Sequence, residues 1–368
     1  MTVTADEATD AGAGQANCLH ITHELADDLA TDAVEREQVG KAPLEEVARL
    51  RESGLLTLLA PAEHGGGGAT WRTAYTAVRT VAAADGAIGH LLGNHYFLSF
   101  SARFFAGPTR AARIERDATA GHWCRGGGIA SHEPPLILTP MSGGYLLNGC
   151  QRYATGAGIA DRLVVRAAKY GTGEPLAVLV DPACPGVVSG SGGDTFGQRL
   201  AAGGGVEFDS VPVAADDVLG SLSPDEGVLP PFSSLAAPTA RLVSVQFCLG
   251  VADGLPAEVR EYGRGMRSPW QPLSPQPWPD SPPQDPYALT AYDASPSSRA
   301  WPSLPPPGPR RRSPPGRVRA KSRAEHPGSL PLLRQVPRRS MISARGPGAP
   351  GDGRLTGICP GQAPIFCV

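Results

Sequence analysis

Proline is distributed unevenly along this chain, and its distribution limits where a packed fold can lie. Of the 38 prolines, 23 lie beyond Arg267. Proline has no backbone N–H to donate, and its ring clashes with the preceding turn of a helix. We therefore expect the folded part to lie before about residue 293, and residues 293–368 to form a Pro/Arg-rich, disordered tail.

The tail also differs in charge from the rest of the chain. Residues 294–368 carry 13 Lys and Arg against two acids. One interpretation is a basic, Pro-rich segment that binds an SH3-like domain, RNA or an acidic surface. The other, which we favour, is a shifted reading frame, because GC-rich coding sequence read one base off yields such mixtures of Arg, Pro, Gly, Ser and Ala.

The main body is acidic, with 20 basic against 33 acidic residues in 1–293, so its charge gives no reason to expect a nucleic acid partner. Seven cysteines without CxxC spacing predict free thiols in a reducing compartment. The acidic N-terminus lacks the features of a signal peptide, and no apolar run approaches the roughly 18 residues that span a bilayer. We expect a cytoplasmic protein that does not enter a membrane.

Hydrophobic periodicity divides the body into helices, strands and a further helix, which predicts an α+β fold. Residues 1–16 are small and polar, and we expect them to be disordered. Spacings of three to four residues predict a helical domain over 17–120, with a helix pair from Trp71 that is broken at Asp85-Gly86. Short apolar runs between Gly, Pro and Asp turns predict an antiparallel β-barrel or sandwich over 121–220. Helical spacing returns at Phe232–Arg267, within an expected C-terminal helical domain over 232–292.

Two stretches contain residue types that can carry chemistry. Gly149–Asp161 places the ring of Tyr153 and the hydroxyl of Thr155 at the end of a predicted strand, beside flexible Gly-Ala-Gly backbone, which suits a flat heterocycle. His90 and His95 lie five residues apart on a predicted helix and so on different faces, which argues against a shared metal site. From the residues alone, either histidine is expected to be a hydrogen-bonded structural residue.

Five blocks, in this order along the chain, resemble the flavin-dependent monooxygenases of the acyl-CoA dehydrogenase superfamily, in particular the branch for sulfur acquisition and dibenzothiophene desulfurisation. The blocks are RESGLLTLLAPAEHGGGGATW, AAADGAIGHLLGNH, GGYLLNGCQRYATGAGIADRLVV, FGQRLAAGGGVEFDSVPVAADDVLG and CLGVADGLPAEVREYGRGMRSPW. The resemblance covers roughly residues 20–292.

The resemblance implies an N-terminal helical domain, a middle antiparallel β-barrel and a C-terminal four-helix bundle. It also implies reduced FMN supplied by a separate flavin reductase, O2 as co-substrate, and a homo-oligomer. Only the first bundle helix is recognisable here, at Phe232–Arg267, so we expect an incomplete bundle that lacks most of the oligomer interface.

The resemblance also implies roles for individual residues. Thr155 would be the hydroxyl that faces the flavin, and His90 the histidine that manages a proton and lies near the substrate. Asn94 would lie within reach of flavin or substrate. Tyr153, packed within the barrel, and Arg199 of the FGQR block would belong to the cofactor site.

The chain departs from the family pattern at three positions of the expected flavin site. Gly127, also assigned to the cofactor site, stands where the relatives have Asn. Gly193 aligns with a Trp that walls the flavin, and Gly203 with a Ser. Loss of an aromatic wall removes on the order of 1 kcal/mol beyond the buried area.

Three functional hypotheses follow from the sequence. The first is a monooxygenase that uses reduced flavin and O2 on a small organosulfur or related substrate. The second is an FAD-dependent acyl-CoA dehydrogenase, which needs a catalytic carboxylate in the C-terminal bundle. The third is a non-enzymatic, truncated product whose tail binds a partner.

Overall fold

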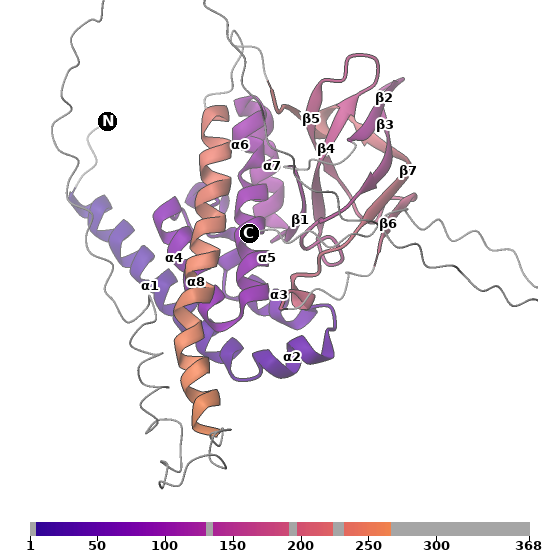
Figure 1. Ribbon diagram of the computed structural model, residues 1–368. Coiled ribbons are helices and arrows are strands. Elements are labelled where there is room, and N and C mark those ends of the chain that lie inside the picture. Colours follow the sequence, from indigo (N-terminus) through magenta and orange to yellow (C-terminus); the bar gives the residue numbers. More distant parts are fainter. Residues whose placement is uncertain (1–4, 130–134, 191–196, 224–231, 266–368) are drawn as a thin grey trace, which may run out of the picture. The chain divides into compact units, whose positions relative to one another are not determined.

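The computed structural model describes residues 5–129, 135–190, 197–223 and 232–265. All of them belong to the first of the chain's two units, Met1–Ser303, and the second unit, Leu304–Val368, lies outside them. The order is helices, then strands, then one long helix, as expected (Figure 1). The predicted tail, 293–368, and residues 266–292 also lie outside the described residues.

Seven helices precede the sheet in the part of the chain described. They are α1 (Ala5–Ala30), α2 (Ala33–Val39), α3 (Leu44–Glu52), α4 (Trp71–Ala84), α5 (Gly86–Ser99), α6 (Ser101–Phe105) and α7 (Pro108–Ala120), with 3-10 turns η1 (Leu55–Thr57) and η2 (Ala62–His64). The expectation of disorder over 1–16 is wrong for residues 5–16, because the Ala-rich sequence there continues α1. Helices α1 and α2 are separated by a turn at Thr31 and Asp32.

Asp85 produces the predicted break between α4 and α5. Its Oδ1 accepts hydrogen bonds from the backbone N–H groups of Ala87 and Ile88, both at 3.0 Å, and so caps the N-terminus of α5. The guanidinium of Arg36 lies 3.1 Å from the same carboxylate and ties α2 to this helix start. The cap sets where α5 begins, and with it the direction of the histidine-bearing helix.

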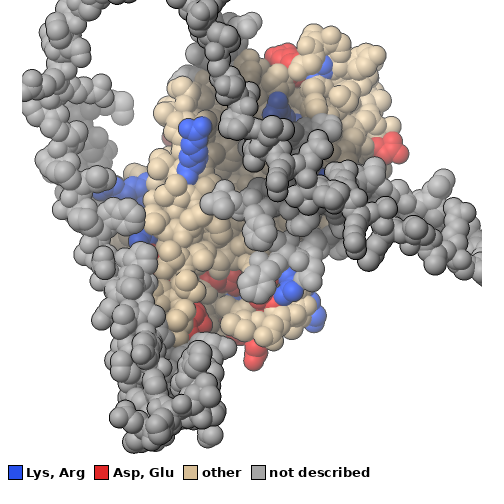
Figure 2. All heavy atoms as spheres, viewed as in Figure 1, with Lys and Arg blue, Asp and Glu red and all other residues tan. Residues whose placement is uncertain are grey.

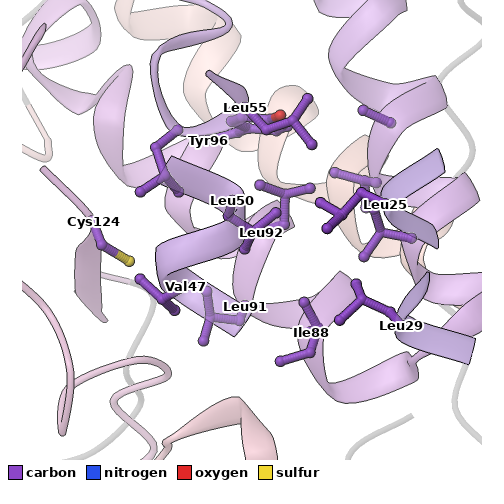
Figure 3. Packing of buried hydrophobic residues seen from close by; sticks show 14 of the residues in the cluster. Leu25, Leu29, Val47, Leu50, Leu55, Ile88, Leu91, Leu92, Tyr96 and Cys124 are labelled. Atoms are coloured by element: carbon purple, nitrogen blue, oxygen red, sulfur yellow. The ribbon is translucent and has the colours of Figure 1, made fainter. Parts of the chain in front are cut away.

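Helix α5 is the centre of the helical domain. It is apolar on nearly all sides, as expected of a helix that is surrounded by other elements. Figure 3 shows its side chains meeting those of α1, α3 and η1. The members of this core labelled there are Leu25, Leu29, Val47, Leu50, Leu55, Ile88, Leu91, Leu92, Tyr96 and Cys124. Because α5 is fixed by packing on several sides, the few polar side chains that it carries toward the sheet are held in place.

The middle domain is one eight-stranded sheet in the order β6-β7-β3-β2-β4-β5-β8, with β1 on β4. The strands are β1 (Arg125–Gly128), β2 (Leu136–Met141), β3 (Gly144–Gln151), β4 (Arg162–Lys169), β5 (Pro175–Val180), β6 (Val187–Ser189), β7 (Val206–Ala214) and β8 (Val218–Ser221). The expectation of an antiparallel barrel is corrected to a mixed sheet, because β4 runs parallel to both β1 and β2. After the β2–β3 hairpin the chain crosses to the far side of β2, so that β4 points the same way as β2.

The last described helix, α8 (Ala236–Gly265), packs along α4 and α5. Gly254 permits the approach, since a Cβ there would lie 2.1 Å from the carbonyl oxygen of Ala83. On its outer side α8 exposes 39% to 58% of six apolar side chains, Leu242, Val245, Leu249, Val251, Leu255 and Val259. Figure 2 shows few charged side chains along it.

By length and composition, α8 qualifies as a membrane-spanning helix. Within Ser233–Pro256, a window of 18 residues has a mean hydropathy of 1.4, and 22% of that window is buried. The sequence-based statement that no segment is long and apolar enough is therefore wrong for this helix. One side of α8 packs against α4 and α5, as in a helical bundle.

Candidate active site

Thr155 lies where the strand end predicted from the sequence meets α5. Its carbonyl oxygen accepts a hydrogen bond from Gly127 N–H of β1 at 2.9 Å, and the two residues form an isolated bridge. Asn94 of α5 donates from Nδ2 to the same carbonyl at 3.2 Å and to Gly127 O at 3.4 Å. One amide of the helix thus holds both sheet segments, and the structure brings three of the predicted site residues together.

A second segment supports the turn that contains Thr155. Ala154 N–H donates to Gly204 O at 3.0 Å, and Gly156 N–H donates to Ala201 O at 2.9 Å. The two residues flanking Thr155 are therefore bonded to the last residue of the 3-10 turn η3 (Arg199–Ala201) and to the chain just after it. The FGQR block and the YATG block are far apart in the sequence, and these hydrogen bonds join them into one wall of the candidate site.

Tyr153 does not pack within the barrel, as the sequence analysis expected. Its side chain is 72% exposed, and its backbone has a φ of 55°, in the left-handed region. This conformation bends the chain directly after β3 and turns the ring out of the sheet interior. A role for Tyr153 in cofactor binding stays a prediction.

His90 lies one helical turn before Asn94, on the same side of α5. Its Nδ1 is 2.7 Å from Oε1 of Gln198, and its ring stacks on Phe247 of α8 with centroids 5.0 Å apart and planes at 28°. Burial lowers the pKa of the imidazole, and the hydrogen bond to Gln198 opposes this shift in part. His90 is therefore a neutral, oriented imidazole at pH 7.

His95 has a different environment from His90, although both come from the GHLLGNH motif. It is fully buried, its Nε2 lies 2.8 Å from Leu56 O, and its Nδ1 lies 3.0 Å from the backbone nitrogen of Arg125. Burial lowers its pKa to about 4. Since Arg125 N–H can only donate, Nδ1 accepts and Nε2–H donates to Leu56. His95 is the hydrogen-bonded structural residue that the sequence analysis expected of a helical histidine.

Arg199 lies against α2. Its Nη1 donates to the carbonyl oxygen of Glu37 at 3.2 Å and lies 3.7 Å from the carboxylate of the same residue. The preceding residue, Gln198, is the one that reaches His90. A contact between Arg199 and a cofactor stays a prediction.

Gly127 is required by its backbone conformation. Its φ is 110°, and a Cβ would lie 2.4 Å from the carbonyl oxygen of Val164 on the neighbouring strand. The side-chain amide of the family pattern therefore cannot be present on this backbone. At Gly203, in contrast, a Cβ would meet only Thr155 Cα, at 3.8 Å. Gly193 lies outside the described residues.

The sequence analysis missed Gln198 and Phe247. Gln198 lies in the FGQR block, of which the resemblance assigned Arg199 to the cofactor site. Phe247 falls on the helical stripe of α8, where an aromatic residue is typical of a core. Both contact His90 across long sequence separations, which no local pattern encodes.

The residues at this site fit the polar edge of a flat heterocycle such as a flavin. The open space beside Gly203, which a Cβ would fill, adjoins the Thr155 turn. The Thr155 hydroxyl, the backbone groups of the turn and the neutral imidazole of His90 are groups that can bind and orient a ring edge that carries both donors and acceptors. Among the described residues no cluster of three potential metal ligands occurs.

Comparisons with known proteins agree with this arrangement. The acyl-CoA dehydrogenase N-terminal domain family matches residues 20–104. A dibenzothiophene monooxygenase of Rhodococcus erythropolis is 33% identical over 282 residues, covering 73% of this chain and 66% of the relative. The probable FMNH2-dependent monooxygenase SfnC of Pseudomonas putida is 29% identical, covering 74% and 68%. FMN-bound TdsC from Paenibacillus sp. A11-2 superposes with a TM-score of 0.65 at 31% identity, covering 75% and 71%.

The helical domain, the mixed sheet and the helix that follows define an acyl-CoA dehydrogenase-like fold. The chain belongs to the flavin-dependent monooxygenases of the acyl-CoA dehydrogenase superfamily, in the branch that contains the dibenzothiophene monooxygenases. It spans 66% of the length of the Rhodococcus relative.

The backbone at Gly127 generates a first prediction. Gly127→Ala should lower the free energy of unfolding by at least about 2 kcal/mol, because a positive φ and a close carbonyl both oppose a Cβ. Gly203→Ala is the matched control and should change it by less than about 0.5 kcal/mol. Urea unfolding followed by circular dichroism measures both. Equal effects of the two substitutions would contradict the geometry at Gly127.

His95 generates a second prediction, on pH. Its pKa is about 4 in the folded protein against 6.5 for an exposed histidine, so the unfolded chain takes up a proton first as the pH falls. Stability is fully present above pH 6.5 and falls by up to about 1.4 kcal/mol per pH unit until about pH 4. His95→Gln should lower stability at pH 7.5 and remove this part of the slope. If the wild type and the variant show the same slope, His95 does not titrate as described.

Proposed function

We propose that the protein is a monooxygenase that uses reduced FMN and O2 to oxygenate a small organosulfur compound. The observation that carries the proposal is the neutral imidazole of His90, held by Gln198 and Phe247 on the same side of α5 as Asn94 and the Thr155 strand end. The relatives support it, since they are monooxygenases by name and one was solved with FMN.

The wall formed by Thr155 and by the segments around Gly127 and Gly203 would hold the edge of the flavin. Reduced flavin bound there would supply the electrons that O2 needs. The Thr155 hydroxyl can donate to a ring acceptor or to an oxygen atom beside the ring. The Asn94 amide nitrogen already bonds two carbonyls, so it positions the strand end, and a direct contact with flavin or substrate stays a prediction.

His90 would hold or move the proton that oxygen transfer requires. A neutral imidazole can accept a proton at one nitrogen while the other stays bonded to a protein group. The apolar side chains of α5 and α8 around it exclude water from that exchange.

The alternative of an FAD-dependent acyl-CoA dehydrogenase has less support. None of the relatives reported above points to FAD, and the solved relative contains FMN. The alternative of a partner-binding tail concerns residues outside those described, and a pull-down that depends on residues 294–368 would favour it.

The proposal includes a partner and a location. An enzyme that uses FMNH2, as the name of the Pseudomonas relative states, needs a separate flavin reductase to supply it. Such a pair requires the reducing interior of a cell, and described cysteines such as Cys18, Cys124 and Cys184 are free thiols. We therefore propose a cytoplasmic protein that receives reduced flavin by diffusion from the reductase.

The test uses the full chain with FMN, a flavin reductase, NADH and dibenzothiophene under 18O2. We expect a sulfoxide or sulfone that carries the label, at a level above that of the reductase alone. Thr155→Val should lower the rate by about 10- to 100-fold, because it removes one hydrogen bond to a charged or strongly polar group but conserves shape. Thr76→Val on the exposed side of α4 is the control. Labelled product at an equal rate from Thr155→Val would remove Thr155 from the site, and no labelled product from the wild type would contradict the proposed activity on this substrate.

A further inference from the structure

Gln198 makes a short contact with His90 that joins two distant parts of the chain. Its Oε1 lies 2.7 Å from Nδ1 of His90, across 108 positions of sequence. Gln198 immediately precedes η3. The last residue of η3 and the chain just after it accept hydrogen bonds from the two neighbours of Thr155. The hydrogen bond therefore links the histidine on α5 to the same wall that holds the expected flavin edge.

We infer that Gln198 is a positioning residue that fixes the tautomer of His90, with the proton on Nδ1 and with Nε2 presented as the proton acceptor. An amide oxygen can only accept, so a neutral imidazole at 2.7 Å must donate from Nδ1. A neutral imidazole has one ring proton, which leaves Nε2 with a lone pair. Without such a partner, imidazole in water favours the proton on Nε2, so the contact selects the less common tautomer.

Phe247 fixes the remaining freedom of the ring. The two rings stack with centroids 5.0 Å apart and planes at 28°, so α8 covers one face of the imidazole. The hydrogen bond to Gln198 then limits rotation of the imidazole within its own plane, and the stacking on Phe247 limits tilting of that plane. No hydrogen bond to Nε2 occurs among the described residues, which makes it the ring nitrogen that can meet a reactant.

The protonation state of His90 agrees with this role. Burial lowers its pKa, so the ring is neutral at pH 7 and can take up a proton. When Nε2 accepts a proton from a donor in the site, both ring nitrogens carry N–H and the ring becomes cationic. The Gln198 oxygen then bonds a charged donor, which is a stronger hydrogen bond than the neutral one.

His95 offers an internal reference on the same helix. Its Nδ1 accepts from Arg125 N–H and its Nε2–H donates to Leu56 O, so it has the opposite tautomer. Both of its ring nitrogens are bonded within the fold, whereas for His90 the described residues provide a partner for Nδ1 alone. The two histidines of one motif should therefore give opposite nitrogen signatures in one spectrum.

The meaning of this tautomer for catalysis rests on the proposed function, whereas the tautomer itself does not. The test is a long-range 1H–15N spectrum of the full chain labelled at histidine, at pH 7.5. His90→Asn identifies the signals of His90, and His95→Gln those of His95. We expect a protonated Nδ1 and an unprotonated Nε2 for His90, and the reverse for His95.

Substitutions at Gln198 separate positioning from general structure. Gln198→Leu should shift His90 toward the Nε2–H tautomer, and Gln198→Glu, which keeps an acceptor oxygen, should retain Nδ1–H. Gln38→Leu on the exposed side of α2 is the control and should leave both histidines unchanged. An Nε2–H signal for His90 in the wild type, or an unchanged tautomer in Gln198→Leu, would overturn the inference.

The same variants in the oxygenation assay report on mechanism. Gln198→Leu should lower kcat about 10-fold with little change in KM, and Gln198→Glu should recover part of the loss. A wild type that shows the expected tautomer without oxygenase activity would contradict the proposed function and leave the tautomer assignment standing. An active wild type with the opposite tautomer would overturn the assignment alone.

Discussion

One side-chain amide holds the site together. Asn94 donates to the carbonyls of both Thr155 and Gly127, so it joins α5 to the end of the Thr155 turn and to β1. Helix α5 is itself fixed by the Asp85 cap and by apolar packing on several sides. Through its two hydrogen bonds, the Asn94 amide fixes these sheet segments relative to α5. The contact of His90 with Gln198 and the hydrogen bond from Arg125 N–H to His95 are two further polar links between α5 and the sheet domain.

The site also shows how a family pattern can change within a conserved fold. At Gly127 the backbone has a φ of 110° and a neighbouring carbonyl that excludes any Cβ, so the loss of the usual amide is built into the strand. At Gly203 there is room for a side chain beside Thr155, so the absence of a hydroxyl there is a matter of sequence alone. The backbone therefore requires glycine at Gly127, whereas at Gly203 it does not, although both positions depart from the family pattern.

The sequence predicted the elements better than the contacts between them. The order of helices and strands, the break at Asp85 and the strand end at Thr155 follow from local periodicity and turn residues. The parallel pairing of β4 did not, because strand patterns do not encode strand order. Tyr153 was placed in the barrel because an aromatic residue near a strand is usually packed, whereas its left-handed backbone turns it outward. Gln198 and Phe247 meet His90 only through the tertiary fold.

The central claim is that α5 and the Thr155 turn together form a site for reduced flavin. An anaerobic titration of the full chain with FMNH2 tests it most directly when wild type is compared with Asn94→Leu, and circular dichroism shows whether the variant is folded. We expect saturable binding by the wild type and an affinity reduced about 10-fold or more in a folded Asn94→Leu, because the two carbonyls lose their common donor. Equal affinity in the two proteins, or no binding by the wild type, would contradict it.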